Sequence, residues 1–336
     1  MPILRKLILR LIKVNNRMLF ISSVLLISVS SILIVHIEPE TFVTYFDGFW
    51  WVMTTVTTVG YGDLSPVTTE GRILAIILYI LGIGLIGVVI GKVVDGLSAF
   101  RKKREEGKLV FKGTGHYIII GWSEKANYAL QEMLKTKKDI QVVIIDEREK
   151  APLLSENIFF VKGYGTSMDT LEKANVKEAE SVLIFADDSI QENQLVDGKT
   201  LLIASTVESI APEVHTVVEV MEESHIHNFK HIEVDDFIYS RETISSLAVR
   251  TIFAKGISEV YGQLLRHQHG DDLYHIPTRE EWHTYGDAFQ DLLKEGATLI
   301  ADGKNLGINR MLDEKIREDA KLYVVCDRST YDKLIG

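Results

Sequence analysis

The stretch Thr58-Val59-Gly60-Tyr61-Gly62 lies between two long apolar segments and decides how the chain is interpreted. Its two glycines allow positive φ angles without a Cβ clash. Backbone in such conformations can turn successive carbonyl oxygens toward one axis, where they replace the hydration shell of a potassium ion. The threonine hydroxyl can add one more oxygen at the inner end. The stretch therefore predicts a selectivity filter that holds K⁺.

Two apolar segments flank this stretch. Met18 to Ile37 contains no Asp, Glu, Lys or Arg, and Ile73 to Val94 is interrupted only by Lys92. Each is long enough to cross a hydrocarbon core of about 30 Å. A secretory signal peptide is disfavoured, because the first run is too long and lacks a small-residue cleavage site. The sequence predicts two membrane-spanning helices.

Basic residues indicate the orientation of these helices. Arg5, Lys6, Arg10, Lys13 and Arg17 precede the first segment, and a second basic group follows the second one. The connecting stretch carries almost no basic residue, so both termini are expected on the cytoplasmic side of the bilayer. Residues 2–14 have an apolar face and predict either a helix on the inner leaflet or an extension of the first span.

The connection between the spans is too apolar for an ordinary external loop. Residues 46–57 predict a short helix that dips into the membrane, with Trp50 and Trp51 packed near polar partners. Four acids, Glu38, Glu40, Asp63 and Glu70, are expected to concentrate cations at the mouth. One filter strand cannot enclose an ion, so four copies must surround the axis and the chain is expected to form a homotetramer.

Glycines interrupt the second apolar segment. Gly82 and Gly84 are the best candidates for a gating hinge, and close helix packing is the alternative interpretation of the same residues. The apolar segments contain no ladder of arginines, so no voltage-sensing module is expected.

The rest of the chain is charged and acidic. The whole sequence has 47 Asp and Glu against 37 Lys and Arg, a net charge of −10, which argues against a nucleic-acid partner. After a polar linker over 98–114, apolar strand patterns alternate with helical ones from His116 to Val220. This alternation predicts a doubly wound parallel sheet. The single cysteine, Cys326, fits a buried strand in a reducing compartment.

The turn after the first predicted strand is an incomplete dinucleotide-binding motif. Gly121 keeps the first glycine of G-x-G-x-x-G, whereas Ser123 and Ala126 replace the other two. Asp146, which ends the second strand, is placed to hold a ribose hydroxyl. The turn therefore indicates either a nucleotide site or a structural remnant of one. A membrane-anchored nucleotide-dependent oxidoreductase is the alternative function, although no catalytic constellation accompanies the motif.

These motifs together resemble those of prokaryotic two-span potassium channels gated by RCK domains (regulators of potassium conductance). The resemblance rests on residues 58–63, 81–84, 120–124 and 169–176. It implies an all-α membrane pore with two spans and a pore helix, joined to a soluble α/β Rossmann-like RCK domain with a small α+β lobe. The implied domains are a pore over 1–97, the linker, an N-lobe over 115–240, a crossover helix and dimer interface over 241–269, and a C-terminal lobe over 270–336.

The resemblance also implies how such a chain works. RCK domains pair into a gating ring of four or eight, ligand binding pulls on the second span, and the channel lies in a prokaryotic plasma membrane with its RCK domain in the cytoplasm. An ungapped comparison puts Phe185, Glu219 and Met221 at the family's calcium-binding positions, so that only Glu219 keeps its acid. Regulatory Ca²⁺ or a nucleotide is therefore an open expectation.

Other acids and histidines remain candidates for the regulatory site. Asp187, Asp188, Glu222 and Glu223 can regroup around Glu219, since calcium takes six to eight oxygens, and Glu219 with Glu222 is the candidate divalent pair. Two histidine groups could bind a transition metal or sense pH; their members are His225, His227 and His231, and His267, His269, Asp271, Asp272 and His275. Solvent-exposed polar residues are the alternative in each case.

Overall fold

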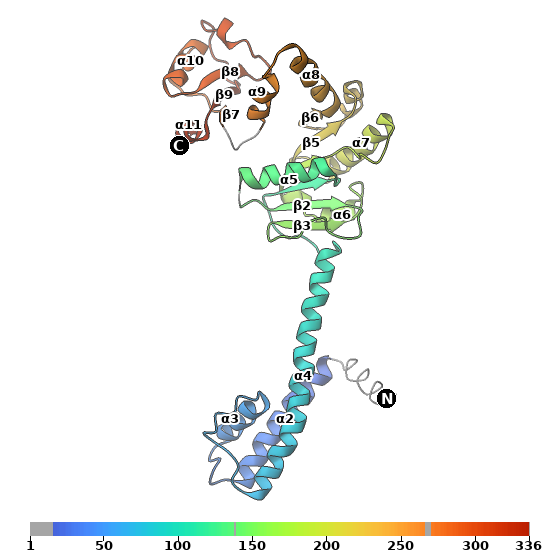
Figure 1. Ribbon diagram of the computed structural model, residues 1–336, viewed down its shortest axis with the longest axis vertical. Coiled ribbons are helices and arrows are strands. Elements are labelled where there is room, and N and C mark those ends of the chain that lie inside the picture. Colours follow the sequence, from blue (N-terminus) through green and yellow to red (C-terminus); the bar gives the residue numbers. More distant parts are fainter. Residues whose placement is uncertain (1–15, 138, 266–269, 336) are drawn as a thin grey trace. The chain divides into compact units, whose positions relative to one another are not determined.

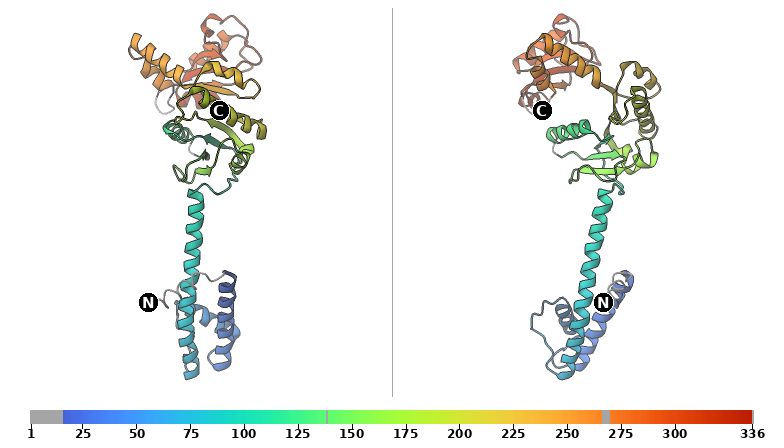
Figure 2. Two further views of the ribbon diagram at one scale, coloured as in Figure 1. Left: turned by 90° about the vertical axis from the view of Figure 1, so that its right-hand side faces the viewer. Right: turned by 45° about the vertical axis from the view of Figure 1, so that its right-hand side comes forward.

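The computed structural model describes residues 16–137, 139–265 and 270–335. The chain divides into two compact units, one up to Lys102 and the other from Lys103 onward, and each is described by itself (Figure 1, Figure 2). The predicted helix over residues 2–14 lies outside the described residues.

From residue 16 onward, the first unit has the helices α2 (Asn16–Ile37), α3 (Tyr45–Val56) and α4 (Thr69–Glu105). Helices α2 and α4 are long and apolar enough to cross a membrane, as predicted. Helix α4 also continues through residues 98–105, which the sequence analysis assigned to the linker. These residues favour a helix because they include Ala, Arg, Lys and Glu but no Pro or Gly. The helix ends where Gly107 takes a φ of 63°.

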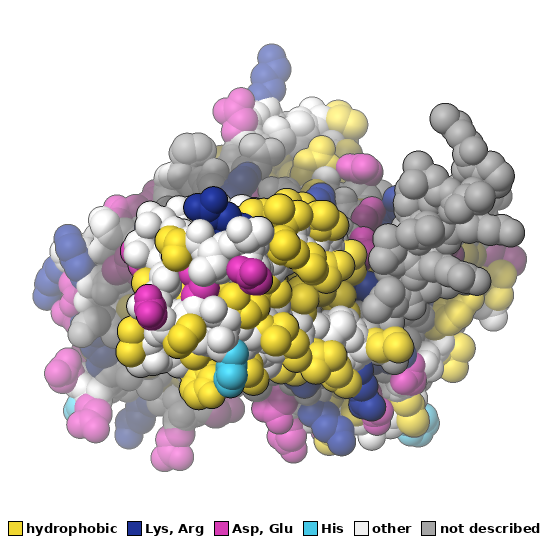
Figure 3. Space-filling view, turned by 90° about the horizontal axis from the view of Figure 1, so that it is seen from below, with side chains coloured by type: hydrophobic (Ala, Val, Ile, Leu, Met, Phe, Trp, Pro, Cys, Tyr) yellow, Lys and Arg dark blue, Asp and Glu magenta, His cyan; other side chains and the backbone are white. Residues whose placement is uncertain are grey.

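The buried side chains of this unit join all three helices. Ile34 of α2, Trp51 and Val52 of α3, and Ala75 and Leu78 of α4 form one apolar cluster. Many other apolar side chains on the same helices are exposed in the single chain. Viewed from below, hydrophobic side chains cover much of the near surface (Figure 3). Such a surface suits contact with lipid or with further copies of the chain.

Glu38 connects the end of α2 to the start of α4. Only 3% of this residue is exposed, and its carboxylate accepts hydrogen bonds from Val67 N at 3.0 Å, Thr68 N at 2.9 Å and Thr68 Oγ1 at 2.5 Å. A Cβ added to Gly71 would overlap Glu38 Oε1, so a side chain there would displace this carboxylate. The sequence analysis expected Glu38 at the mouth; in the structure its oxygens bind the backbone that enters α4.

The second unit contains a six-stranded parallel sheet in the order β3-β2-β1-β4-β5-β6. Its strands are β1 (His116–Ile120), β2 (Val142–Asp146), β3 (Ile158–Lys162), β4 (Ala179–Ile184), β5 (His215–Val220) and β6 (Asp236–Tyr239). The first five are those that the sequence predicted. The sequence analysis did not identify β6, which is short and begins with Asp, a residue that strands disfavour.

Helices cover both faces of this sheet because the strand side chains alternate. Helix α5 (Glu124–Thr136) packs on the face that carries Ile119 and Ile144. Helices α6 (Met168–Lys173) and α7 (Asn193–Ile210) pack on the opposite face, against strand residues such as Ile118. The 3₁₀ turns η1 (Val176–Glu178) and η2 (Glu223–Phe229) follow α6 and β5. This arrangement confirms the predicted doubly wound sheet.

Two helices lead from this sheet to a smaller lobe. Helices α8 (Ser240–Phe253) and α9 (Ile257–Leu264) have no buried residue in the single chain. The lobe has an antiparallel sheet in the order β7-β9-β8, formed by β7 (Asp272–Ile276), β8 (Thr298–Asp302) and β9 (Leu322–Cys326). Helices α10 (Tyr285–Lys294) and α11 (Arg328–Ile335) and the turn η3 (Ile308–Arg310) complete it. Cys326 is buried in β9, as predicted.

His116 is a neutral histidine inside the six-stranded sheet. It is fully buried, and its Nε2–H donates to Ala174 O at 2.9 Å. Burial lowers the pKa of His116 in the folded state, whereas the unfolded chain has the ordinary value of about 6.5. Below that pH the unfolded state binds more protons than the folded state, so the free energy of unfolding falls as the solution is acidified.

We therefore expect the melting temperature of the second unit to decrease as the pH falls below about 6.5. Replacing His116 with Gln keeps a donor for Ala174 but removes the titrating group, so the decrease should become shallower. His231, which is exposed, is the control: His231→Gln should leave the pH dependence unchanged. Equal slopes for the wild type and His116→Gln would contradict this prediction.

Candidate functional sites

The predicted filter stretch follows directly after α3. Thr58, Gly60 and Gly62 have φ angles of 61°, 54° and 76°, so every second residue is left-handed. The positive φ angles predicted for the two glycines are confirmed, whereas that of Thr58 was not foreseen. A non-glycine residue in this conformation is uncommon and often marks a functional segment.

Hydrogen bonds join this stretch to the last turn of α3. Thr58 N donates to Thr55 O at 3.0 Å, and Val59 N and Gly60 N donate to Thr54 O at 2.9 and 3.0 Å. The carboxyl end of a helix carries partial negative charge, which favours a cation. The fold thus places the filter stretch where both its own carbonyls and the helix end suit a positive ion.

Aromatic and acidic side chains support the outer part of the stretch. The Trp50 indole N–H donates to Asp63 Oδ2 at 2.9 Å. The Trp50 and Tyr61 rings are stacked, with 5.8 Å between centroids and an interplanar angle of 2°. The stacking holds the Tyr61 ring against α3.

A second candidate site lies at the carboxyl edge of the parallel sheet. A cavity of about 350 Å³ is lined by the residues that follow β1, β2, β3 and β4, and by Lys199 and Ile203 of α7. The chain reverses its strand order between β1 and β4, and ligands of doubly wound sheets bind at such a point. The predicted residues Gly121, Ser123, Asp146, Asp187 and Asp188 all line this cavity.

The turn residues at this cavity already have structural partners. Gly121 has a φ of 87°, and an added Cβ would lie 3.3 Å from Phe185 O. Ser123 caps α5, since its Oγ accepts from Ala126 N at 3.4 Å. Asp146 accepts from Trp122 N at 2.9 Å and from Arg148 Nε at 2.8 Å. The turn is therefore ordered by the protein itself, while the cavity remains large enough for a small polar ligand.

Asp187 is held in its charged form on the wall of the cavity. Burial opposes ionisation, but hydrogen bonds from Lys199 and Ser189 outweigh it and lower the pKa of Asp187 to about 2. The Lys199 Nζ lies 2.8 Å from Asp187 and 3.4 Å from Glu147. Because Lys199 is shared by two carboxylates, the cavity wall has no excess of positive charge.

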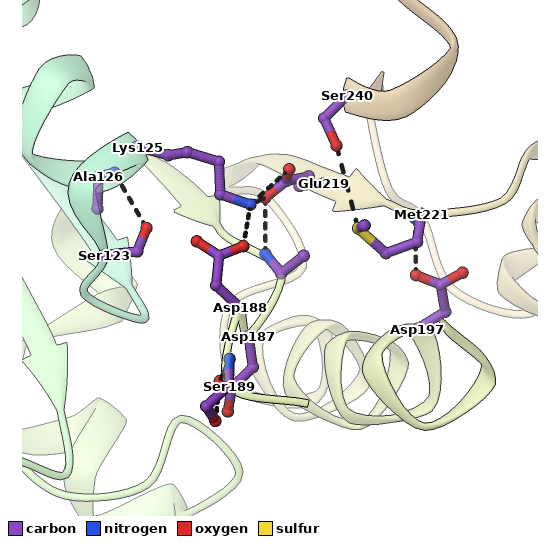
Figure 4. A network of polar contacts seen from close by, with 11 residues as sticks. Ser123, Lys125, Ala126, Asp187, Asp188, Ser189, Asp197, Glu219, Met221 and Ser240 are labelled. Carbon is purple, nitrogen blue, oxygen red and sulfur yellow. Dashed lines mark hydrogen bonds and ion pairs between the residues drawn. The ribbon is translucent and has the colours of Figure 1, made fainter. Parts of the chain in front are cut away.

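Glu219 has an internal cation as its partner (Figure 4). This residue is 1% exposed, and Lys125 Nζ lies 2.9 Å from each of its carboxylate oxygens. Ala186 N also donates to Glu219 at 2.9 Å, and Lys125 contacts Asp188 at 2.7 Å. Calcium needs six to eight oxygen ligands, but Phe185 and Met221 provide no carboxylate. The residues at the family's calcium positions therefore do not fit a calcium ion.

Glu222 belongs to a different contact network from Glu219. Its carboxylate accepts from Asn193 Nδ2 at 2.8 Å and lies 3.5 Å from His225 Nε2. The His225 Nδ1–H donates to buried Asp197 at 2.6 Å, and Asp197 also accepts from Met221 N at 2.8 Å. The structure thus does not bring Glu219 and Glu222 together as a pair of metal ligands.

Within the part of the chain that the structure describes, no group of three His, Cys, Asp or Glu residues could hold a metal ion. Of the second histidine group, His267 and His269 lie outside the described residues. His275 is exposed on β7 and its ring contacts Tyr323 edge-on.

The sequence analysis missed the two lysines that organise the carboxyl edge. Lys125 was not recognised because it lies beside Glu219 only after folding, 94 positions away in sequence. Lys199 lies in the middle of α7 with nothing in the local pattern to distinguish it from a solvated residue. The excess of acids after β4 and β5 could have indicated that lysines lie nearby, since buried carboxylates need a positive partner.

Comparisons with known protein families agree with this division of the chain. Residues 20–99 match the ion channel family Ion_trans_2, and residues 117–240 match the TrkA-N domain. The chain is therefore a membrane protein that joins an ion channel domain to a TrkA-N domain. Neither match indicates an enzyme family.

Two relatives of this chain are named as potassium channels, YugO as a putative one. YugO of Bacillus subtilis is 33% identical over 209 residues, which is 62% of this chain and 63% of that protein. The calcium-gated potassium channel TvoK of Thermoplasma volcanium is 33% identical over 218 residues, which is 64% of this chain and 62% of TvoK. The chain thus matches less than two thirds of the length of each. These relatives confirm the resemblance to two-span channels with an RCK domain.

A solved structure supports the fold of the second unit. The human SLO3 gating ring superimposes with a TM-score of 0.52 and 12% identity, covering 65% of this chain and 46% of that chain. At this identity the likeness concerns the fold alone.

Proposed function

We propose that this chain is a subunit of a potassium-selective channel that a ligand gates through its cytoplasmic RCK domain. The alternating left-handed backbone of Thr58, Gly60 and Gly62 at the end of α3 is the observation that carries the proposal. Four such stretches around one axis surround a dehydrated K⁺ with carbonyl oxygens. The protein then lies in a prokaryotic plasma membrane as a homotetramer, with both termini and the RCK domain in the cytoplasm.

Ion flux into liposomes that contain the purified full chain tests this proposal. Potassium and rubidium should enter, and sodium should be excluded. Equal sodium and potassium flux would contradict the selectivity, and no flux above that of empty liposomes under any tested ligand would contradict the channel function.

A second copy of the chain is the proposed partner of α8 and α9. Apolar side chains on α8 and directly after α9 are widely exposed, namely Ile244 at 68%, Ile252 at 79%, Phe253 at 85% and Leu265 at 71%. A continuous exposed apolar surface usually marks an interface. Pairing of two RCK domains through this surface removes these side chains from water and forms the unit of a gating ring.

Replacing Phe253 with Glu should weaken this pairing by about 2 kcal/mol or more, the usual loss at a central aromatic contact. Lys255 lies between α8 and α9, so amine cross-links from Lys255 of one chain to Lys255 of another report the pairing. We expect Phe253→Glu to remove most of these cross-links. Lys294→Glu on α10 is the control and should keep them. Undiminished cross-linking in Phe253→Glu would contradict the interface.

The cavity at the carboxyl edge is the proposed regulatory site, and a nucleotide is the ligand class that its position favours. Asp146 Oδ2, which accepts one hydrogen bond from Trp122 N, can accept another from a ribose hydroxyl, and the N-terminus of α5 attracts a phosphate. Calcium is the other candidate because TvoK is named as calcium-gated, but at Glu219 it would have to displace Lys125.

Thermal shift measurements on the full chain in detergent separate these ligands. A nucleotide that binds the cavity should raise the melting temperature, and Gly165→Ile should reduce the shift because the Gly165 backbone lines that cavity. A calcium-induced shift that Glu219→Gln abolishes would show instead that calcium binds at the family position.

A further inference from the structure

Gly82 of α4 packs tightly against the last residue of α3. A Cβ added to Gly82 would lie 3.1 Å from Val56 Cγ2 and 3.4 Å from both Val56 Cα and Cγ1. Val56 is only 3% exposed, so its side chain cannot turn into solvent. A methyl group at position 82 would therefore have to displace Val56 Cγ2 by a few tenths of an ångström, and it would lie in van der Waals contact with the α3 backbone.

Gly84 provides a natural comparison two residues further along α4. A Cβ added there would meet nothing within 4 Å in the single chain. Helix α4 is continuous through both glycines. The two candidate hinge residues therefore differ in one respect that the sequence could not show: one is a packing contact and the other is not.

The turn of α3 that receives Gly82 also holds the filter stretch. The carbonyl oxygen of Thr54 accepts from Val59 N and Gly60 N, and that of Thr55 accepts from Thr58 N. Val56 directly follows these two acceptors. Any displacement of Val56 by α4 therefore shifts the carbonyls that fix the left-handed backbone of the filter.

We propose that Gly82 is a positioning residue for the selectivity filter. Without a side chain, Gly82 lets α4 approach α3 closely enough to support Val56, and this contact keeps the Thr54 and Thr55 carbonyls in register with the filter. The inference rests on the proposed channel function and adds a role for Gly82 other than bending. A bend of α4 during gating then changes the support of the filter through the same contact.

The experiment compares ion selectivity among variants of the full chain in liposomes. Gly82→Ala should lower the ratio of potassium to sodium flux about tenfold, an effect of the size that an extra methyl in a close contact produces. Gly84→Ala is the matched control and should keep the wild-type ratio. The double variant Gly82→Ala with Val56→Ala should regain most of the selectivity, because the shorter side chain makes room for the added methyl.

A hinge role alone predicts a different pattern. In that case Gly82→Ala and Gly84→Ala both change the total flux, while the ratio of potassium to sodium flux stays constant. Adding Val56→Ala to Gly82→Ala then does not restore the wild-type flux. This pattern overturns the inference. If Gly82→Ala does not assemble, the double variant decides: a selective tetramer supports the inference, and failure of both variants contradicts it. A wild type without potassium flux removes the proposed function as well, whereas a selective wild type with an unaltered Gly82→Ala removes this inference alone.

Discussion

Replacing Gly60 with Ala is expected to abolish selective potassium flux. Gly60 has a φ of 54°, and an L-residue in that region costs about 1 to 2 kcal/mol. Four copies around one pore bring the cost to roughly 4 to 8 kcal/mol, so the conducting backbone should become at least about a thousandfold less populated. Flux of potassium into liposomes measures the loss.

A glycine without such a backbone constraint serves as the control for Gly60. Gly96 lies within α4, and an added Cβ would meet nothing within 4 Å. Gly96→Ala should therefore keep the selectivity ratio of the wild type. Wild-type flux and selectivity in Gly60→Ala would show that the conducting backbone does not need the left-handed conformation at residue 60.

The second large effect is expected from replacing Lys125 with Met. Methionine keeps much of the side-chain volume but leaves the buried Glu219 carboxylate without its cation. Breaking a buried ion pair from one side costs about 3 to 5 kcal/mol, and the partial exposure of Lys125 favours the lower end. A loss of about 3 kcal/mol corresponds to a melting temperature roughly 6 to 12 °C lower for a domain of this size.

Two further variants show whether the loss of the Lys125–Glu219 ion pair causes the lower melting temperature. Lys173→Met removes an exposed pair with Asp169 and should cost less than about 1 kcal/mol. Adding Glu219→Gln to Lys125→Met removes the unpaired charge while keeping an acceptor for Ala186 N, so part of the lost stability should return. A Lys125→Met protein with the melting temperature of the wild type would contradict the stabilising role of the Lys125–Glu219 pair.

Local sequence patterns were sufficient to predict those parts of the structure that depend on nearby residues. The apolar runs of α2 and α4 have a length set by a bilayer, and the strand–helix alternation from His116 to Val220 allows few arrangements other than a parallel sheet. The left-handed glycines of the filter stretch were also predictable, since they have no Cβ. By contrast, local patterns did not reveal β6, because its four residues form a strand through pairing with β5 and not through their own propensity.

The partners of charged side chains could not be predicted in this way. Glu38 was expected at an open mouth, but it binds Val67 and Thr68, about 30 residues further along the chain. Glu219 and Glu222 are three residues apart in sequence, yet their carboxylates have entirely different partners. A carboxylate takes the nearest donors that folding provides, and its sequence neighbours do not determine which donors these are.

The sequence by itself determined two helices long and apolar enough to cross a membrane, the left-handed glycines of the stretch between them and the doubly wound sheet, because backbone conformation and apolar length follow from nearby residues. Only the tertiary structure decided that Lys125 neutralises Glu219, and that Gly82 but not Gly84 packs against Val56. Both results depend on distances between segments that are far apart in the chain, and such distances are set when the apolar surfaces of those segments pack together.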